Sequence, residues 1–506
     1  MNKKTHIILL AVLACAAYFN SLPNAFISDD IPAIAGGANI GKLSYVASQP
    51  MFFLRPLLYY GIAGIFGKTA IFFRLLNIIF HLGTVLAAYL LIRRLHNPAA
   101  AFFSAAIFAV HPLGIEAVGW ISGGPYSQSG FFLLMSLLFF ASRKENGPFY
   151  AFSVVMFIMA LASSVTALAF PFILAAFIAS FGKIREDWKN LIPFFVLGII
   201  WACTGASQIN NRYAILASEY SQKTEWLNPL IQIPFAVTSY LQLIFWPAGL
   251  TLYHSETLMS RAAYLARAGL FIIFIAAAAY LFKRNRKLFF WPAFFIICLM
   301  PMLNPLGISS VVAERYAYLA SLGICALTGL ALARISTIKR SRLAAYIIFI
   351  AIVSALLTRT MIRNADWKNE DSLWIATVRV SPSSPNAHNN MGDFYSRRGN
   401  LDNAVKEFIR AIELKPGYAD AWHNLGSAYL AMGKLKEAEG AYKKAVALKP
   451  GLWQSYQDLS VLYFRSNNLV ASRDNAIKAA GLNPSSRELR HNLAVIESGL
   501  KEVKTR

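Results

Sequence analysis

Long apolar stretches recur through the first 360 residues of this 506-residue chain and then stop. Each is about long enough to cross the hydrocarbon core of a bilayer as a helix, a form in which a segment satisfies its own backbone hydrogen bonds. The sequence therefore predicts an all-α fold with a polytopic transmembrane helical domain. Eleven spans are expected, near residues 5–20, 70–92, 98–113, 127–142, 148–163, 165–181, 189–205, 263–282, 288–304, 314–334 and 342–360.

Basic residues between these stretches indicate which side of the membrane each loop faces. They cluster at residues 93–94, 143–144, 183–189, 283–287 and 339–342. Because cytoplasmic loops are enriched in Lys and Arg, we place all five clusters and the N-terminus inside, and an odd number of spans then leaves the C-terminal part outside. Membrane topology therefore explains most of the net charge of +23, and no nucleic-acid partner is expected.

Two further apolar segments do not fit this alternation. If residues 52–66 or 230–247 crossed the membrane, a basic loop would be turned outward. We interpret both as re-entrant or interfacial segments. Arg55-Pro56 and Trp246-Pro247 support this interpretation, since a proline interrupts a regular helix.

Acidic residues are scarce in the membrane part, and most fall on the predicted outer side. These outer acids are Asp29, Asp30, Glu116, Glu219, Glu225, Glu256 and Glu314. The adjacent pair Asp29-Asp30 follows the first span directly, and two neighbouring carboxylates repel each other unless solvent, cations or hydrogen-bond donors stabilise them. The pair predicts an outward-facing polar site. The alternative is a solvated loop that caps a helix.

The C-terminal part has a different regularity. Pro382, Pro416, Pro450 and Pro484 are spaced by 34 residues, and helical patterns with small residues in register lie between them. This is the period of the tetratricopeptide repeat, an α-solenoid unit of two helices. We therefore expect a membrane domain over 1–360, a connector over 361–384, and a repeat domain over 385–506 with three repeats and a capping helix.

Arrays of this kind bind peptides or proteins in a concave groove. The candidates for contact with a protein acceptor are His388, Asn389, Tyr395, His423, Asn424 and Tyr429. Ordinary positions on a helix face are the alternative for most of them. We find no catalytic pattern in this part of the chain.

Short patches of the membrane part resemble the GT-C glycosyltransferases. The patches are residues 24–30 (NAFISDD), 53–57 (FLRPL), 74–81 (RLLNIIFH), 108–122 (FAVHPLGIEAVGWIS), 301–305 (PMLNP) and 313–319 (AERYAYL). With the repeats, they are similar to the transmembrane and tetratricopeptide-repeat branch, which is related to protein O-mannosyltransferases. The chain departs from that pattern in having Ser164-Val165 in place of a Lys-Glu pair, and Pro125 and Ser127 in place of an Arg and an Asp.

The resemblance implies transfer of a sugar from a polyprenyl-phosphate-linked donor to a protein acceptor. In that reaction the acceptor loses a proton and the phosphate gains charge. Asp29 is the candidate base, with Asp30 as its partner, and the pair can also hold a divalent cation, Mg or Mn. The candidate substrate-binding residues are Arg55, His111, Glu116, Glu314, Arg315 and Tyr316, with Arg315 as the first choice for the phosphate. Alternatively, Glu314 and Arg315 pair with each other, and His111 is an ordinary interfacial histidine.

Two other functions remain open at this stage. A non-catalytic, membrane-anchored repeat scaffold for envelope assembly is favoured by the departures at residues 125, 127, 164 and 165. A glycan ligase or polymerase of another membrane fold is opposed by the short late loop near residues 304–313, which carries no charge before Glu314. We expect a bacterial inner-membrane protein whose repeats lie in the periplasm.

Overall fold

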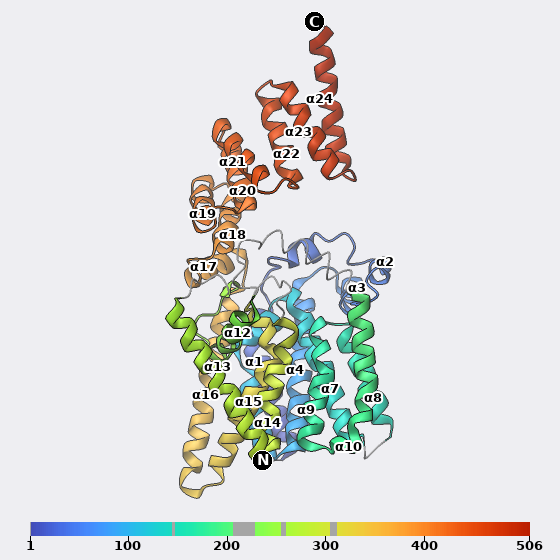
Figure 1. Cartoon of the computed structure of the whole chain (residues 1–506), viewed down its shortest axis with the longest axis vertical. Helices are drawn as coiled ribbons and strands as arrows, with labels where there is room; N and C mark the ends of the chain where they lie inside the picture. Colours follow the sequence, from blue (N-terminus) through green and yellow to red (C-terminus); the bar gives the residue numbers. More distant parts are fainter. Residues whose placement is uncertain (1, 144–146, 206–227, 255–259, 304–310, 506) are drawn as a thin grey trace. The chain divides into compact units, whose positions relative to one another are not determined.

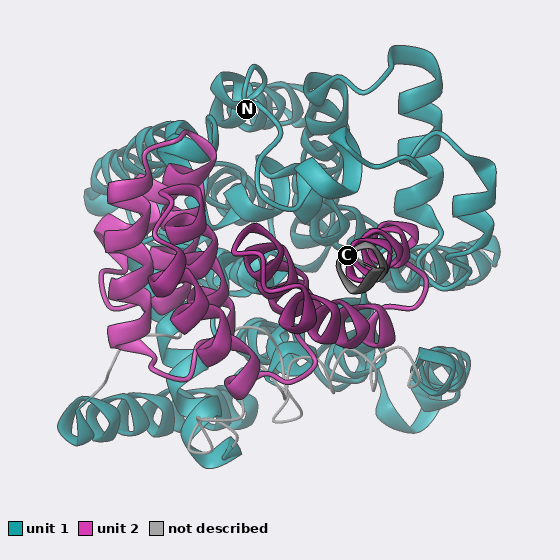
Figure 2. Cartoon of the chain, turned by 90° about the horizontal axis from the view of Figure 1, so that it is seen from above, with its two compact units in different colours: residues 1–255, 259–373 teal, residues 256–258, 374–506 magenta. Residues whose placement is uncertain are grey.

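The computed structural model describes residues 2–143, 147–205, 228–254, 260–303 and 311–505 (Figure 1). Three of the predicted outer acids, Glu219, Glu225 and Glu256, lie outside the described residues. The chain divides into two compact units, one of residues 1–255 and 259–373 and the other of residues 256–258 and 374–506 (Figure 2). Both units are helical throughout the described ranges, which confirms the predicted all-α fold class.

The first unit is a bundle of long helices joined by short helical turns. Its longer helices are α1 (Lys3–Tyr18), α3 (Leu54–Phe66), α4 (Ala70–Leu95), α5 (Pro98–Ala109), α7 (Gly124–Ser142), α8 (Pro148–Leu161), α9 (Phe170–Phe181), α12 (Pro229–Phe245), α13 (Arg261–Arg284), α14 (Arg286–Leu299), α15 (Tyr318–Ser336) and α16 (Arg342–Asp366). In its centre, α15 packs on α5 and α14, and α4 packs on α5 and α7.

Six described helices are long and apolar enough to cross a membrane, or seven if one bent pair is a single span. The bent pair joins α5 to the segment 112–118 at an angle of 57°. The bend has a local cause, because His111 precedes Pro112 and takes the extended conformation that a following proline favours. The other four predicted spans coincide with α7, α8, α9 and α14, which contain 19, 14, 12 and 14 residues.

Figure 1 shows which elements share an end of the bundle. The N-terminus, α10 (Ile184–Asp187) and the turn between α15 and α16 lie at one end, and α2 (Leu43–Ala47), α3 and α12 lie at the other. The two segments predicted as re-entrant or interfacial are thus α3 and α12, of 13 and 17 residues. Like α8, α9 and α14, α3 is shorter than the roughly 17–25 residues of a spanning helix, and α12 lies at the lower limit of that range, so length alone does not separate these two segments from the predicted spans.

The second unit consists of helix pairs. They are α18 (Pro385–Arg397) with α19 (Leu401–Leu414), α20 (Ala419–Ala431) with α21 (Leu435–Leu448), and α22 (Trp453–Arg465) with α23 (Leu469–Leu482), followed by α24 (Arg487–Thr505). Two small residues let paired helices approach closely, since an added Cβ on Gly392 would lie 2.6 Å from Phe408, and one on Gly426 would lie 2.7 Å from Tyr442. The chain enters this unit through α17 (Glu370–Val380), within the predicted connector.

Candidate functional site

A buried arginine of α4 fixes the loop that follows α1. Arg74 donates hydrogen bonds to the carbonyl oxygens of Leu22, Asn24 and Ala25 at 2.7 to 3.1 Å, and to that of Gly119 at 2.8 Å. One guanidinium therefore binds three carbonyls of the first loop and one of the segment after α6 (Ile115–Val118). The conformation of the first loop is set by α4 before the aspartate pair is reached.

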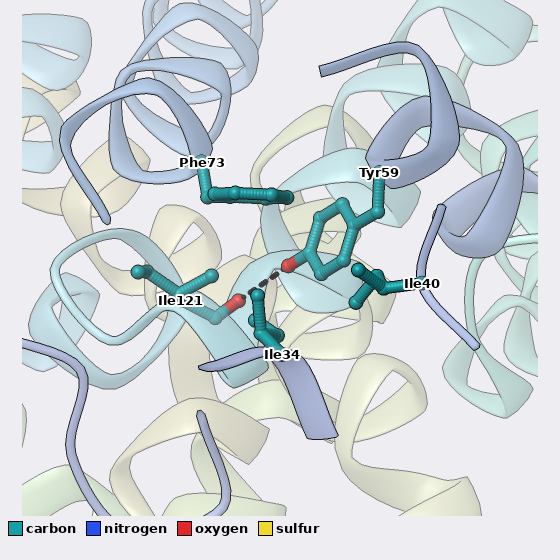
Figure 3. Packing of buried hydrophobic residues seen from close by; sticks show 5 residues of the cluster. All are labelled: Ile34, Ile40, Tyr59, Phe73 and Ile121. Carbon is teal, nitrogen blue, oxygen red and sulfur yellow. Dashed lines mark hydrogen bonds between the residues drawn. The ribbon is translucent and has the colours of Figure 1, made fainter. Parts of the chain in front are cut away.

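The chain beyond the aspartate pair is anchored by a hydrophobic cluster. Figure 3 shows Ile34 and Ile40 packed with Tyr59 of α3, Phe73 of α4 and Ile121. The hydroxyl of Tyr59 donates to the Ile121 carbonyl oxygen at 2.9 Å. The pair is consequently held from both sides, by polar contacts before it and by apolar packing after it.

The two aspartates have different environments. Asp30 is fully buried, and its Oδ1 accepts hydrogen bonds from the backbone nitrogen of Ser122 at 2.8 Å and from the Ser122 hydroxyl at 2.5 Å. Burial raises the pKa of Asp30 to about 6, although Ser122 and Arg74 act in the opposite direction. Asp29 is exposed. The loop thus turns one carboxylate inward as an anchor and leaves the other accessible to a substrate.

The residue before the pair has an uncommon backbone conformation. Ser28 has a φ of +50°, in the left-handed region that residues with a side chain seldom adopt. Such conformations persist where the surrounding structure imposes them, and they concentrate at functional sites. Here the contacts of Arg74 and Asp30 on either side impose the turn that presents Asp29.

Arg55, predicted as the second phosphate contact, lies beside this pair. Its Nη2 lies 3.5 Å from the Ser122 hydroxyl oxygen, and its guanidinium lies 5.2 Å from the centre of the Tyr59 ring. Ser122 is therefore shared by Asp30 and Arg55. This brings a cation from α3 close to the acidic loop.

His111 has both ring nitrogens in hydrogen bonds. Its Nδ1 accepts from the backbone nitrogen of Leu113 at 3.3 Å, and its Nε2 lies 3.0 Å from the Ile244 carbonyl oxygen, to which it donates in that tautomer. It is buried. In this structure the residue joins the bend after α5 to α12, which favours the structural alternative over contact with the sugar.

Glu116, Glu314 and Arg315 belong to a cluster of buried charges. Glu116 Oε2 accepts from the backbone nitrogen of Arg315 at 3.2 Å and from its Nη1 at 2.9 Å. Glu314 Oε1 accepts from Nη2 of Arg363 at 3.2 Å and lies 3.4 Å from His254 Nε2. The alternative that the neighbours Glu314 and Arg315 pair with each other is therefore wrong, because each pairs with a residue from another element.

Aromatic rings link the two ion pairs. The guanidinium of Arg315 lies 5.6 Å from the ring centre of Trp120 and 5.0 Å from that of Tyr316, and the guanidinium of Arg363 lies 5.7 Å from that of Trp367. The two tryptophan rings are 5.7 Å apart. Only Arg315 has a partly accessible side chain, 16% exposed against 0% for Arg363. Of the two cations, Arg315 is the one that a ligand can reach.

The end of α16 holds the first loop as well as this cluster. Asn364 Nδ2 donates to the Ala17 carbonyl oxygen at 2.8 Å and to Asn20 Oδ1 at 2.7 Å, and its own carbonyl oxygen accepts from Asn24 at 3.0 Å. The last predicted span ended at Thr360, before this segment. The sequence signal for it is a helical pattern that continues beyond the apolar stretch into polar residues.

A metal site at the aspartate pair stays a prediction. Within the described ranges, no group of three or more His, Cys, Asp or Glu side chains is arranged to hold an ion. With one carboxylate buried against Ser122, the pair alone would supply only part of the oxygen shell that Mg²⁺ or Mn²⁺ prefers.

The candidate acceptor residues of the repeats form contacts between successive units. Asn424 donates to Asn389 at 3.0 Å, and His423 lies 3.0 Å from the Ser455 hydroxyl and 3.8 Å from Asp458. Both pairs join a residue of one repeat to the residue 35 positions later. The same inter-repeat contact is therefore made twice, along the first helices of the repeats.

The other three candidates are more deeply engaged. His388 lies 2.6 Å from Glu407 and 3.0 Å from the Pro382 carbonyl oxygen. Burial lowers the pKa of His388, but the contacts with Glu407 and Pro382 outweigh it, and the net shift is upward. Tyr395 and Tyr429 pack against the core around Phe408 and Leu425. Tyr395 and Tyr429 therefore contribute to the packing of the repeats, whereas His388, Asn389, His423 and Asn424 form polar contacts.

Comparisons with known proteins agree with both parts of this description. A family model described as tetratricopeptide repeat matches residues 383–451. Protein O-mannosyl-transferase Tmtc2 of Drosophila melanogaster is 34% identical over 123 residues, which cover 23% of this chain and 13% of that protein. Protein O-mannosyl-transferase TMTC3 of Homo sapiens is 22% identical over 475 residues, which cover 80% of this chain and 51% of that protein.

The solved structures similar to part of this chain include the first tetratricopeptide-repeat domain of Spaghetti (RPAP3) bound to an HSP90 peptide, with 22% identity, 23% of this chain and 94% of that one covered, and a TM-score of 0.23. The chain spans about half the length, or less, of the curated relatives it matches.

The fold and the site define an all-α membrane protein with many apolar helices, a clustered ionic site and a C-terminal tetratricopeptide-repeat array. Its relatives are named as protein O-mannosyl-transferases. The predicted resemblance is confirmed: the chain is a homologue of the protein O-mannosyl-transferases of the transmembrane and tetratricopeptide-repeat branch.

Proposed function

We propose that this chain is a membrane glycosyltransferase that moves a sugar from a polyprenyl-phosphate-linked donor to a protein acceptor bound by the repeats. Mannose is the sugar that the names of the relatives indicate. The observation that supports catalysis most directly is an exposed carboxylate, Asp29, on a loop fixed by Arg74, Asp30 and Ser122. A rigid loop that presents one accessible acid is what a general base requires.

In the proposed reaction, the Asp29 carboxylate takes the proton of an acceptor hydroxyl. The hydroxyl oxygen forms a bond to C1 of the sugar, and the bond from C1 to the phosphate oxygen breaks. The polyprenyl phosphate leaves with an added negative charge, which Arg315 and Arg55 offset. Asp30 does not touch the substrate; it is a positioning residue that holds the loop through Ser122.

We place this site on the outer side of the membrane. The support comes from the basic clusters, which assign the loops at residues 183–189 and 339–342 to the cytoplasmic side, and α10 and the α15–α16 turn lie at the end of the bundle opposite α3 and α12 (Figure 1). In a bacterial inner membrane the repeats would then lie in the periplasm, with the protein acceptor.

The substitution Asp29→Asn tests the proposal. We expect transfer to a protein acceptor to fall by about a hundredfold or more, since an amide cannot take the proton, while the affinity for the donor is retained. Transfer is measured with radiolabelled donor and purified protein in detergent. The control is Asp402→Asn, which removes an exposed acid of α19 in the repeats. Wild-type transfer by both Asp29→Asn and Asp30→Asn would contradict the catalytic assignment.

One observation favours the scaffold as a second candidate. At the position where the family has a Lys-Glu pair, the Ser164 hydroxyl accepts from the backbone nitrogen of Thr166 at 3.3 Å and from its hydroxyl at 3.0 Å. The hydroxyls satisfy each other locally, and neither Ser164 nor Val165 can supply charge to a phosphate. A scaffold would bind its protein partner as well with Asp29→Asn as without it, and would consume no donor.

A further inference from the structure

Two ion pairs lie close together in the charge cluster: Arg315 pairs with Glu116, and Glu314 pairs with Arg363. Glu116 and Glu314 are both fully buried, and Coulomb interactions link Glu116 to Glu314 and to Arg363 as well as to Arg315. Two carboxylates and two guanidiniums therefore share one desolvated region. Each carboxylate needs a cation, because a buried charge without a partner is strongly unfavourable.

The two arginines differ in how accessible their side chains are to a ligand. Arg363 is completely buried and is also bound to Asp366 at 3.1 Å. Arg315 is partly exposed, and it lines a small cavity with Tyr126, Tyr316 and Tyr318. An anion that approaches this region can meet Arg315 and not Arg363.

We propose that Arg363 is a positioning residue for the donor: by occupying Glu314, it keeps that carboxylate from competing with the donor phosphate for Arg315. This inference rests on the proposed function, in which Arg315 meets the phosphate. Of the two carboxylates, Glu116 is then the one that holds Arg315, through one nitrogen of the guanidinium and through the Arg315 backbone. Without Arg363, the buried Glu314 carboxylate would keep only the contact of Oε1 with His254 Nε2 at 3.4 Å among those described here, and its negative charge would then act on the guanidinium of the next residue, Arg315.

The sequence supplies a matched control on the same helix. Arg359 lies about one turn before Arg363, and its guanidinium donates to the carbonyl oxygens of Pro247 at 2.9 Å and Ala248 at 3.1 Å. Like Arg363, it joins α16 to another segment through its guanidinium. In both of these hydrogen bonds the acceptor is a backbone carbonyl of the segment after α12.

The test compares wild type with Arg363→Met, Glu314→Gln, the double variant of both, and Arg359→Met. We measure the KM for polyprenyl-phosphate mannose, the KM for the acceptor, and thermal unfolding. We expect Arg363→Met to raise the donor KM by about tenfold or more, the size of losing a hydrogen bond between charged groups, with the acceptor KM unchanged. Glu314→Gln and the double variant should raise the donor KM by clearly less than Arg363→Met does, since no competing carboxylate is created, and Arg359→Met should stay within about twofold of wild type.

The double variant separates competition from simple loss of structure. If it binds the donor as weakly as Arg363→Met does, or if Glu314→Gln is equally weak, Arg363 acts through stability and the proposal is overturned. If Arg363→Met fails to fold, the donor KM of the double variant is compared with that of wild type instead. The double variant is expected to fold, because removing both charges of a buried pair is far better tolerated than removing one.

Binding of sugar-free polyprenyl phosphate to the same variants distinguishes failure of this inference from failure of the proposed function. If wild type transfers no sugar but binds polyprenyl phosphate with the expected order among the variants, the proposed function fails and the role of Arg363 stands. Equal binding by wild type, Arg363→Met and the double variant would overturn the inference whatever the catalytic result.

Discussion

At the scale of single residues, the burial of the Asp30 carboxylate affects the stability of the folded protein. This carboxylate is fully buried, and burial raises its pKa from 3.8 to about 6. Between about pH 4 and pH 6 the folded protein keeps the proton that the unfolded chain has lost. The contribution of Asp30 to the free energy of unfolding therefore falls as the pH rises through this window, and it stays low above pH 6.

We predict that Asp30→Asn melts at a higher temperature, relative to wild type, at pH 7.5 than at pH 4.5. The two-unit shift corresponds to about 3 kcal/mol at most, and loss of the best hydrogen-bond geometry with Ser122 will reduce it. Thermal unfolding in detergent across this pH range measures the difference, with the exposed Asp29→Asn as the control. A difference between Asp30→Asn and wild type that does not change with pH would show that Asp30 carries no buried charge.

At the scale of elements, the repeats depend on small residues where their helices cross. An added Cβ on Gly426 of α20 would lie 2.7 Å from the Tyr442 ring of α21, whereas one on Gly440 of α21 would meet nothing within 4 Å. Both glycines lie inside helices, but a larger residue would clash at Gly426 and would meet no neighbour at Gly440.

We predict that Gly426→Ala destabilises the repeats by about 1–3 kcal/mol through overpacking. Gly440→Ala should stabilise them by about 0.5–1 kcal/mol, because alanine has the higher helix propensity. Chemical unfolding followed by circular dichroism of the purified protein compares the two. Equal effects of both substitutions would mean that the ring of Tyr442 moves freely and that this crossing is not tight.

In the whole molecule, the residues that build the site extend beyond the end of the last predicted membrane span. The last predicted span ended at Thr360, but α16 continues to Asp366, and Arg363, Asn364 and the Lys368 carbonyl oxygen contact the cluster or the first loop. The compact unit ends at Leu373.

We predict that truncation after Leu373 preserves slow hydrolysis of the donor and abolishes efficient transfer to a protein acceptor. Truncation after Thr360 should abolish both, because it removes Arg363 and Asn364. Release of free sugar from labelled donor, and labelling of the acceptor, measure the two activities. Transfer by the Leu373 truncation at the rate of the full chain would show that the repeats have another partner.

We also predict that a reporter fused after Arg506 lies outside the cytoplasm. Alkaline phosphatase, which folds only outside, should be active there, and a reporter active only in the cytoplasm should not be. The opposite result would mean that α3 or α12 crosses the membrane after all.

The sequence was sufficient for the parts of the molecule that local patterns encode. The 34-residue proline spacing located the repeats, and apolar length indicated a membrane part, of which six or seven described helices are long and apolar enough to cross a bilayer. It was insufficient for pairings between distant positions, because one sequence contains no information about which buried charge meets which. Glu314 pairs with a residue 49 positions later, and Arg315 with one 199 positions earlier. Asn389 and Asn424, expected to meet a peptide, also bond to each other.

The position of the last site contacts also bears on how such chains can diversify. The contacts of the first loop and the charge cluster with α16 and its end described above reach as far as Lys368, while the first paired repeat helix begins at Pro385. Insertions, deletions or duplications downstream of that interval leave the hydrogen bonds around Asp30, Arg315 and Arg363 untouched. Lineages could therefore lengthen or shorten the array, and so change the range of proteins modified, under selection that is separate from selection on the chemistry. Residues 360–368 should tolerate no change in length.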